Sequence, residues 1–127
     1  MANAVEESLR FESPVQFLIR IAMEDMKFYG TSIKKHQTVT ICYAAANRDP
    51  GANNRPDEFD ITRKKISHVL FGHGIHLCLG AELARLEARL AIETLLEQYP
   101  NLSVKSAIPK WEPNHFVRGL EELIVNV

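Results

Sequence analysis

At 127 residues, the chain is long enough for one domain with a modest core. Its hydrophobic content of 46% and charged content of 24% are ordinary for a globular protein, and a net charge of -1 excludes a whole-chain electrostatic case for binding nucleic acid or a membrane. Two cysteines, Cys42 and Cys78, fit no disulfide framework and predict a reducing, cytoplasmic setting. No apolar run approaches the length of a transmembrane helix.

The first part of the chain predicts a helix followed by short strands. The segment 2–11 reads as the end of a helix that stops before Ser13-Pro14, because proline restricts the residue ahead of it. The further predictions, in chain order, are an extended segment at 15–22, a turn at 24–25, a strand at 26–28, a turn at 29–30, a strand at 38–43 and a short helical turn at 44–47.

The second part predicts a long loop and a long helix. Residues 48–63 are rich in Pro, Gly, Asn and Asp, so this segment reads as an irregular meander, and a loop of this length is normally functional or disordered. A helix is predicted at 81–99, and its apolar arc is wider than the roughly 100° stripe of an ordinary surface helix. Such a helix needs neighbours on more than one side. An irregular tail leads to a short strand at 123–127.

The most informative segment is FGHGIHLCLG, residues 71–80. We expect the glycines at 72, 74 and 80 to take positive φ angles and to let the backbone approach something flat and bulky. Cys78 lies just ahead of the long helix, whose unpaired N–H groups and dipole favour a thiolate over a thiol. A thiolate held in this way is either a nucleophile or a metal ligand.

Several other roles for Cys78 are open. A lone free cysteine is most often a small buried hydrophobe. His73, His76 and Cys78 could ligate zinc, although structural zinc prefers four ligands and no Cys-x-x-Cys accompanies these three. A catalytic cysteine with a nearby histidine is another option, although no family-specific nucleophile signature surrounds Cys78. Zinc explains neither Phe71 nor the glycine frame.

The pattern Phe-x-x-Gly-x-His-x-Cys-x-Gly resembles the haem-ligand loop of the cytochrome P-450 family, and residues 81–87 resemble the helix that follows this loop in soluble bacterial members. The resemblance implies that Cys78 is the thiolate axial ligand of the iron of haem b. It also implies that His76 contacts a haem propionate and that Phe71 packs beside the cysteine. Arg20 stands where the family has a propionate-binding arginine, although a solvated arginine at a strand end is an equal alternative.

Glu7 and Arg10 lie three residues apart on one helix face. Alone, such a pair is usually exposed and worth a few tenths of a kcal/mol. By resemblance, it is the Glu-x-x-Arg pair of the family, which joins an arginine of the meander in a buried network. Arg48 and Arg55 are the candidates for the third member, and we favour Arg48.

The resemblance runs over nearly the whole chain and covers about the last third of a family member. It implies an α+β fold in which residues 1–127 form a single haem-binding C-terminal fragment, with one long helix after the cysteine loop, small antiparallel sheets and an irregular meander. The parent reaction inserts one oxygen atom into an organic substrate, with electrons from a ferredoxin or a flavoprotein.

Alone, the chain is expected to self-associate or to need a missing N-terminal chain, and to lack coupled turnover. The alternative functions are a non-catalytic, partner-binding remnant and a zinc-stabilised structural domain.

Overall fold

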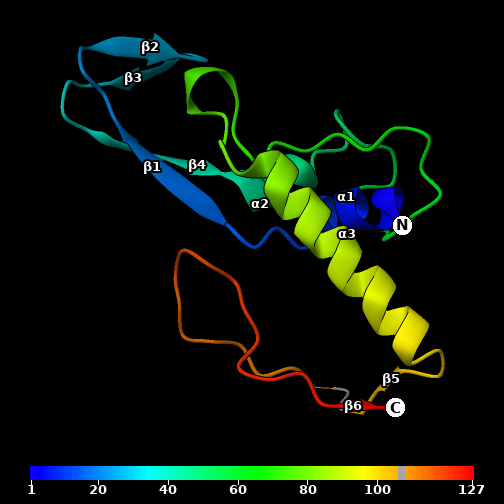
Figure 1. Ribbon diagram of the computed structural model, residues 1–127. Helices are drawn as coiled ribbons and strands as arrows, with labels where there is room; N and C mark the ends of the chain where they lie inside the picture. Colours follow the sequence, from blue (N-terminus) through cyan, green and yellow to red (C-terminus); the bar gives the residue numbers. More distant parts are fainter. Residues whose placement is uncertain (106–107) are drawn as a thin grey trace.

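The computed structural model describes residues 1–105 and 108–127. Its elements, in chain order, are α1 (Ala2–Phe11), β1 (Phe17–Ile21), β2 (Met26–Phe28), β3 (Thr31–Ile33), β4 (Thr38–Cys42), α2 (Tyr43–Asn47), the 3-10 turn η1 (Gly74–His76), α3 (Ala81–Gln98), β5 (Ser103–Val104) and β6 (Val125–Asn126). The long helix α3 runs across the molecule beside α1; the strands β1 to β4 extend away from the helices, whereas β5 and β6 lie near the far end of α3 (Figure 1). Within these described ranges, no helix is long and apolar enough to cross a bilayer.

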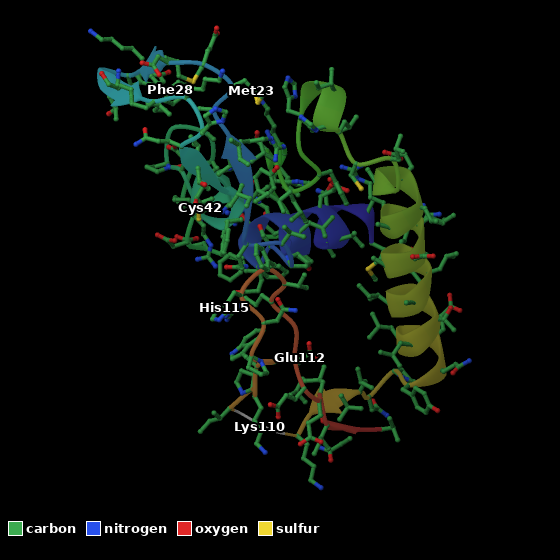
Figure 2. The ribbon with its side chains drawn as sticks, turned by 90° about the vertical axis from the view of Figure 1, so that its left-hand side faces the viewer. Met23, Phe28, Cys42, Lys110, Glu112 and His115 are labelled. Atoms are coloured by element: carbon green, nitrogen blue, oxygen red, sulfur yellow. The ribbon has the colours of Figure 1, made fainter. Side chains whose placement is uncertain are left out.

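The strands form three small antiparallel pairs, as predicted for an α+β fold. β1 pairs with β4, so that Phe17 lies opposite Cys42 and Ile21 opposite Thr38. β2 and β3 form a hairpin that closes through Tyr29 and Gly30, at φ 46° and 83°. Two positive φ angles in a two-residue loop are the requirement of a type I′ turn, whose twist matches that of the strands. Figure 2 shows Phe28 at the far end of this hairpin, away from the helices.

The predicted boundaries differ from the observed ones at two aromatic residues. Tyr43 was expected to end a strand, but it begins α2 and is only 6% exposed. A β-branched run predicts its strand well but does not show where the chain turns inward. Tyr99 follows the end of α3 instead of belonging to it. The strand predicted at 123–127 is reduced to β6, which pairs with β5.

The C-terminal segment is fastened to the start of β1. Val117 bridges Val15, and the guanidinium of Arg118 lies 3.5 Å from the ring centroid of Trp111. Arg118 also forms an ion pair with Glu12, at the end of α1. These contacts hold the loop around His115, labelled in Figure 2, below the β1 strand.

The most deeply buried large side chains are charged. Glu7 and Arg10 are both 0% exposed, and the carboxylate accepts two hydrogen bonds of 2.8 Å from Arg10 Nε and Nη2. The remaining donors of Arg10 reach backbone carbonyl oxygens, those of Pro56 (2.7 Å) and Glu58 (3.0 Å) in the meander and that of Asn47 (3.1 Å) at the end of α2. A guanidinium that is fully paired in this way can be buried without an unsatisfied donor.

The third member of this network is Arg63, and the prediction of Arg48 is wrong. Arg63 Nε donates to Glu7 Oε1 at 3.0 Å. Arg48 instead donates to the carbonyl oxygen of Phe11 at 2.7 Å and 3.1 Å. Arg55, the other candidate, forms ion pairs within the meander. The reason is the path of the chain: Arg48 follows α2 and meets the end of α1, whereas the far end of the meander returns to the middle of α1.

The ionisation of Glu7 should make the fold sensitive to acid. Burial alone raises the pKa of this carboxyl, but hydrogen bonds from Arg10, the Asp60 amide and Arg63 outweigh it and lower the pKa from 4.5 to about 2. Because the folded-state pKa is the lower one, the stabilisation is complete above the unfolded pKa and is lost as the pH falls. We expect the free energy of unfolding to drop by about 3 kcal/mol from this group between about pH 5 and pH 2.

Urea unfolding at a series of pH values measures this effect. Glu7→Gln should show a shallower loss of stability in acid than the parent chain, whereas the same change at the exposed Glu87 should leave the slope unaltered. Parallel profiles for Glu7→Gln and the parent would contradict the role given to Glu7.

Candidate cofactor site

The loop before α3 is held in shape by its own backbone. The Gly72 amide donates to the Val69 carbonyl at 2.8 Å, and the Leu77 amide donates to Gly74 at 3.1 Å. The amide of Cys78 then reaches back to the carbonyl oxygen of Phe71, at 2.8 Å. The loop therefore closes on itself, and the exposed Cys78 is presented just ahead of α3.

Two of the three glycines are required by the backbone. Gly72 has φ 77°, and a Cβ there would stand only 2.8 Å from the carbonyl oxygen of His76. Gly74 has φ 63° in open space. Gly80, however, has φ -86°, so the expectation of a positive φ is wrong at this position. A Cβ at Gly80 would stand 3.9 Å from Cys78 Sγ, which is an ordinary contact, and Gly80 is the N-cap residue of α3.

Cys78 lines a cavity of about 480 Å³ whose walls come from the end of α1, from the β1 segment, from Tyr43 and from the cysteine loop with the start of α3. This volume is within the range of small-molecule and cofactor sites, which are mostly apolar with a few placed polar groups. The lining residues are Leu9, Pro14, Val15, Leu18, Arg20, Tyr43, Leu70, Phe71, Gly72, His76, Cys78 and Ala84. Fold and loop thus bring the predicted residues Arg20, Phe71, His76 and Cys78 to one cavity.

Arg20 and His76 also line a neighbouring hollow of about 360 Å³, together with Tyr43. Arg20 is partly exposed on β1 and donates one hydrogen bond, from Nη1 to the Ile19 carbonyl at 3.0 Å. Since a guanidinium carries five N–H donors, Arg20 retains donors for a carboxylate. An arginine and a histidine at one rim of an apolar cavity make a site for an anionic group on an otherwise apolar ligand.

The zinc interpretation is not supported. In the part of the chain that the structure describes, no three or more His, Cys, Asp or Glu side chains group closely enough to hold a metal ion. His73, His76 and Cys78 are therefore not arranged as a zinc site, although they lie within six consecutive residues.

Two asparagines that the sequence analysis passed over hold the loop in place. Asn47 is 1% exposed; its Oδ1 accepts the Val69 amide and its Nδ2 donates to Ser13 Oγ, both at 2.8 Å. Asn53 pairs its amide group with the backbone of Ser67, at 2.9 Å and 3.2 Å. The available signal was indirect: a long irregular loop must satisfy its buried backbone groups with short polar side chains.

The fold agrees with solved cytochrome P-450 structures. The structure of P450BioI in complex with hexadec-9Z-enoic acid ligated acyl carrier protein matches with a TM-score of 0.93 and 48% identity, over 99% of this chain and 32% of that one. The cytochrome P-450 PksS of the Bacillus subtilis bacillaene polyketide synthase matches with a TM-score of 0.93 and 44% identity, over 98% of this chain and 33% of that one.

The family model described as cytochrome P-450 matches residues 1–125, so the chain belongs to the cytochrome P-450 family. Among curated relatives, the biotin biosynthesis cytochrome P-450 of Bacillus subtilis is 47% identical over 125 residues, which are 98% of this chain and 32% of that protein. The PikC monooxygenase of Streptomyces venezuelae is 45% identical over 95% of this chain and 30% of that protein. The chain thus spans about a third of the length of these relatives.

The three loop glycines should respond to substitution in a graded way. Gly72→Ala combines a positive φ with a backbone clash, and Gly74→Ala carries the φ strain alone. A non-glycine residue held at positive φ costs on the order of 1–3 kcal/mol, so Gly72→Ala should exceed the cost at Gly74. Gly80→Ala should cost under about 1 kcal/mol, since only the helix start is affected. Thermal or urea unfolding of the three variants checks the order, and equal costs at all three positions would refute it.

Proposed function

We propose that this chain is the haem-thiolate part of a cytochrome P-450 monooxygenase, with Cys78 as the ligand of the haem iron. One observation carries the proposal: the exposed Cys78 lies at the wall of an apolar cavity that Arg20 and His76 also line. Family membership supports it, because the relatives named as monooxygenases match over nearly all of this chain.

The residues of the cavity fit haem b in three ways. Cys78 offers sulfur, the donor that a haem-thiolate protein requires. Arg20 and His76 offer N–H groups for the two carboxylates of the porphyrin, and a charge-assisted pair between guanidinium and carboxylate is among the strong hydrogen bonds. Leu9, Leu18 and other apolar residues supply walls for the flat ring.

The glycine at 72 supports this fit from the backbone side. Its missing Cβ lets the loop close tightly, with the His76 carbonyl only 2.8 Å from where a Cβ would stand. Tyr43 lies behind the same position, its hydroxyl 3.9 Å from that point. The loop can therefore present Cys78, Phe71 and His76 on one compact surface.

The haem, when bound, supplies the activation of dioxygen, and the protein supplies binding, orientation and shielding. The proposed reaction of the parent enzyme is the insertion of one oxygen atom into a small organic substrate, with electrons delivered by a ferredoxin or a flavoprotein. We do not expect coupled turnover from the 127-residue chain by itself. The described residues supply the cysteine side of the cavity, and an open site lets water reach the reacting atoms.

The ligand assignment predicts a specific spectrum. After reconstitution with haem and reduction, the carbonyl complex of the parent chain should absorb at the red-shifted position typical of thiolate ligation. Cys78→Ser should abolish this band, because a hydroxyl does not replace the thiolate. Cys42→Ser is the matched control, since Cys42 is also free and exposed but lies on β4. A band that survives Cys78→Ser and disappears in Cys42→Ser would mean that the assignment is wrong.

The polar groups at the rim predict a separate effect on affinity. Arg20→Leu and His76→Leu should each weaken haem retention about tenfold or more, because a hydrogen bond to a charged group is worth roughly 1.5–3 kcal/mol. The position of the carbonyl band should not move, because the sulfur ligand is intact. Haem transfer to apomyoglobin measures retention. Arg89→Leu and His115→Leu, at exposed positions outside the lining of this cavity, are the controls, and equal retention in all four variants would refute the role of the rim.

A further inference from the structure

A second cluster of charged side chains lies behind the cysteine loop, where α1 meets α3. Glu6 accepts a hydrogen bond from Arg85 Nε at 2.6 Å and a weaker one from Nη2 at 3.3 Å. Its other side meets His68 Nε2, at 3.0 Å, and the side chain of His68 is only 5% exposed. One carboxylate of α1 therefore joins the long helix to the segment that leads into the loop.

The same cluster holds the ring of Phe71. The guanidinium of Arg85 lies over this ring, with Cζ 4.6 Å from the centroid, and the imidazole of His68 lies 5.9 Å from it. A cation over an aromatic face is attracted by the ring quadrupole. Phe71 is thus contacted by two side chains that Glu6 orients.

Phe71 is also the residue whose carbonyl oxygen accepts the amide of Cys78, at 2.8 Å. The contacts therefore run without a gap from Glu6 to Arg85, from Arg85 to the Phe71 ring, and from the Phe71 backbone to Cys78. Contacts that fix the Phe71 ring therefore also fix the Phe71 carbonyl, which accepts the hydrogen bond from the Cys78 amide.

The hydrogen bonds of Glu6 determine its charge. Burial alone raises the pKa of the Glu6 carboxyl, but hydrogen bonds from Arg85 and His68 outweigh it and lower the pKa below its usual value of 4.5. The carboxylate is therefore ionised at neutral pH, and its fork to Arg85 is a pair of charge-assisted hydrogen bonds, which fix geometry as well as charge. Glu82, an exposed residue, adds a further contact to Arg85 Nη1 at 2.8 Å.

The next arginine on the helix offers a contrast. Arg89 lies one turn after Arg85, and it pairs with Glu93 within α3 at 3.9 Å. Both arginines line the same hollow of about 440 Å³ between α1 and α3, but the contacts to Glu6 and Phe71 are made by Arg85. A substitution of Arg89 is therefore a matched control for the same substitution of Arg85.

We propose that Arg85 is a positioning residue for Cys78, acting through the ring and backbone of Phe71 and oriented by Glu6. As far as the sulfur is to bind haem iron, this inference rests on the proposed function. The contacts through which Arg85 fixes the loop do not need a bound cofactor.

The first experiment uses the haem-free chain and measures hydrogen exchange of individual amides. Arg85→Ala should exchange the Cys78 amide about tenfold faster, which matches the loss of a partly desolvated cation–π contact. The amide of Ala22, which donates to Gln37 just beyond the paired ends of β1 and β4, is the reference amide away from the loop and should change little. Arg89→Ala should leave both amides as they are in the parent chain.

Two outcomes of this experiment overturn the inference. One is a Cys78 amide that exchanges at the parent rate in Arg85→Ala. The other is equal acceleration at Cys78 and Ala22, which means that the substitution only loosens the whole fold.

The second experiment uses the haem-reconstituted chain and measures the share of the carbonyl complex that shows the thiolate band. Arg85→Ala should lower this share severalfold, and Arg85→Lys should restore part of it, since lysine keeps the cation over the ring but loses the fork to Glu6. An unchanged share in Arg85→Ala also overturns the inference. If the parent chain forms no thiolate complex while the Cys78 amide responds to Arg85→Ala, the proposed function fails and the hold of Arg85 on the loop stands.

Discussion

The buried ion network of Glu7, Arg10 and Arg63 is the constraint on which the rest of this structure depends. Removing such charges from water is costly, and the cost is met only when every donor and acceptor finds a partner. Arg10 does so by binding the Asn47 carbonyl at the end of α2 and two backbone carbonyls of the meander, as well as Glu7. These hydrogen bonds fix the path of the meander around α1.

The position of the cysteine loop follows from that path. Once the meander is fixed, Asn47 and Asn53 lie where their amide groups can bind the backbone at Val69 and Ser67. These contacts fix the backbone just before the tight turn at Gly72. The charged core and the cofactor cavity are therefore consecutive parts of one arrangement, even though no residue of the ion network lines the cavity.

The two charged clusters lie outside the lining of the cavity, but they share the helices α1 and α3 with it. α1 contributes Glu6 and Glu7 to the two charged clusters and Leu9 to the apolar wall. The long helix α3 contributes Arg85 on one side, while Leu83, Leu86 and Leu90 stay 44–58% exposed. Large apolar side chains at this exposure form an apolar surface along α3, and the relatives that match are about three times as long as this chain.

Local sequence determined most of the elements. The helix at 2–11 ends shortly before a proline, the strand at 38–42 follows β-branched alternation, and the loop with its glycines precedes a long helix. These features depend on neighbours within a few residues. Only the tertiary structure decided that Arg63 and not Arg48 reaches Glu7, and that Arg85 lies on Phe71. Each of these depends on the three-dimensional path of the meander or on the packing of α1 against α3, and partners far apart in the chain leave no periodic pattern in the sequence.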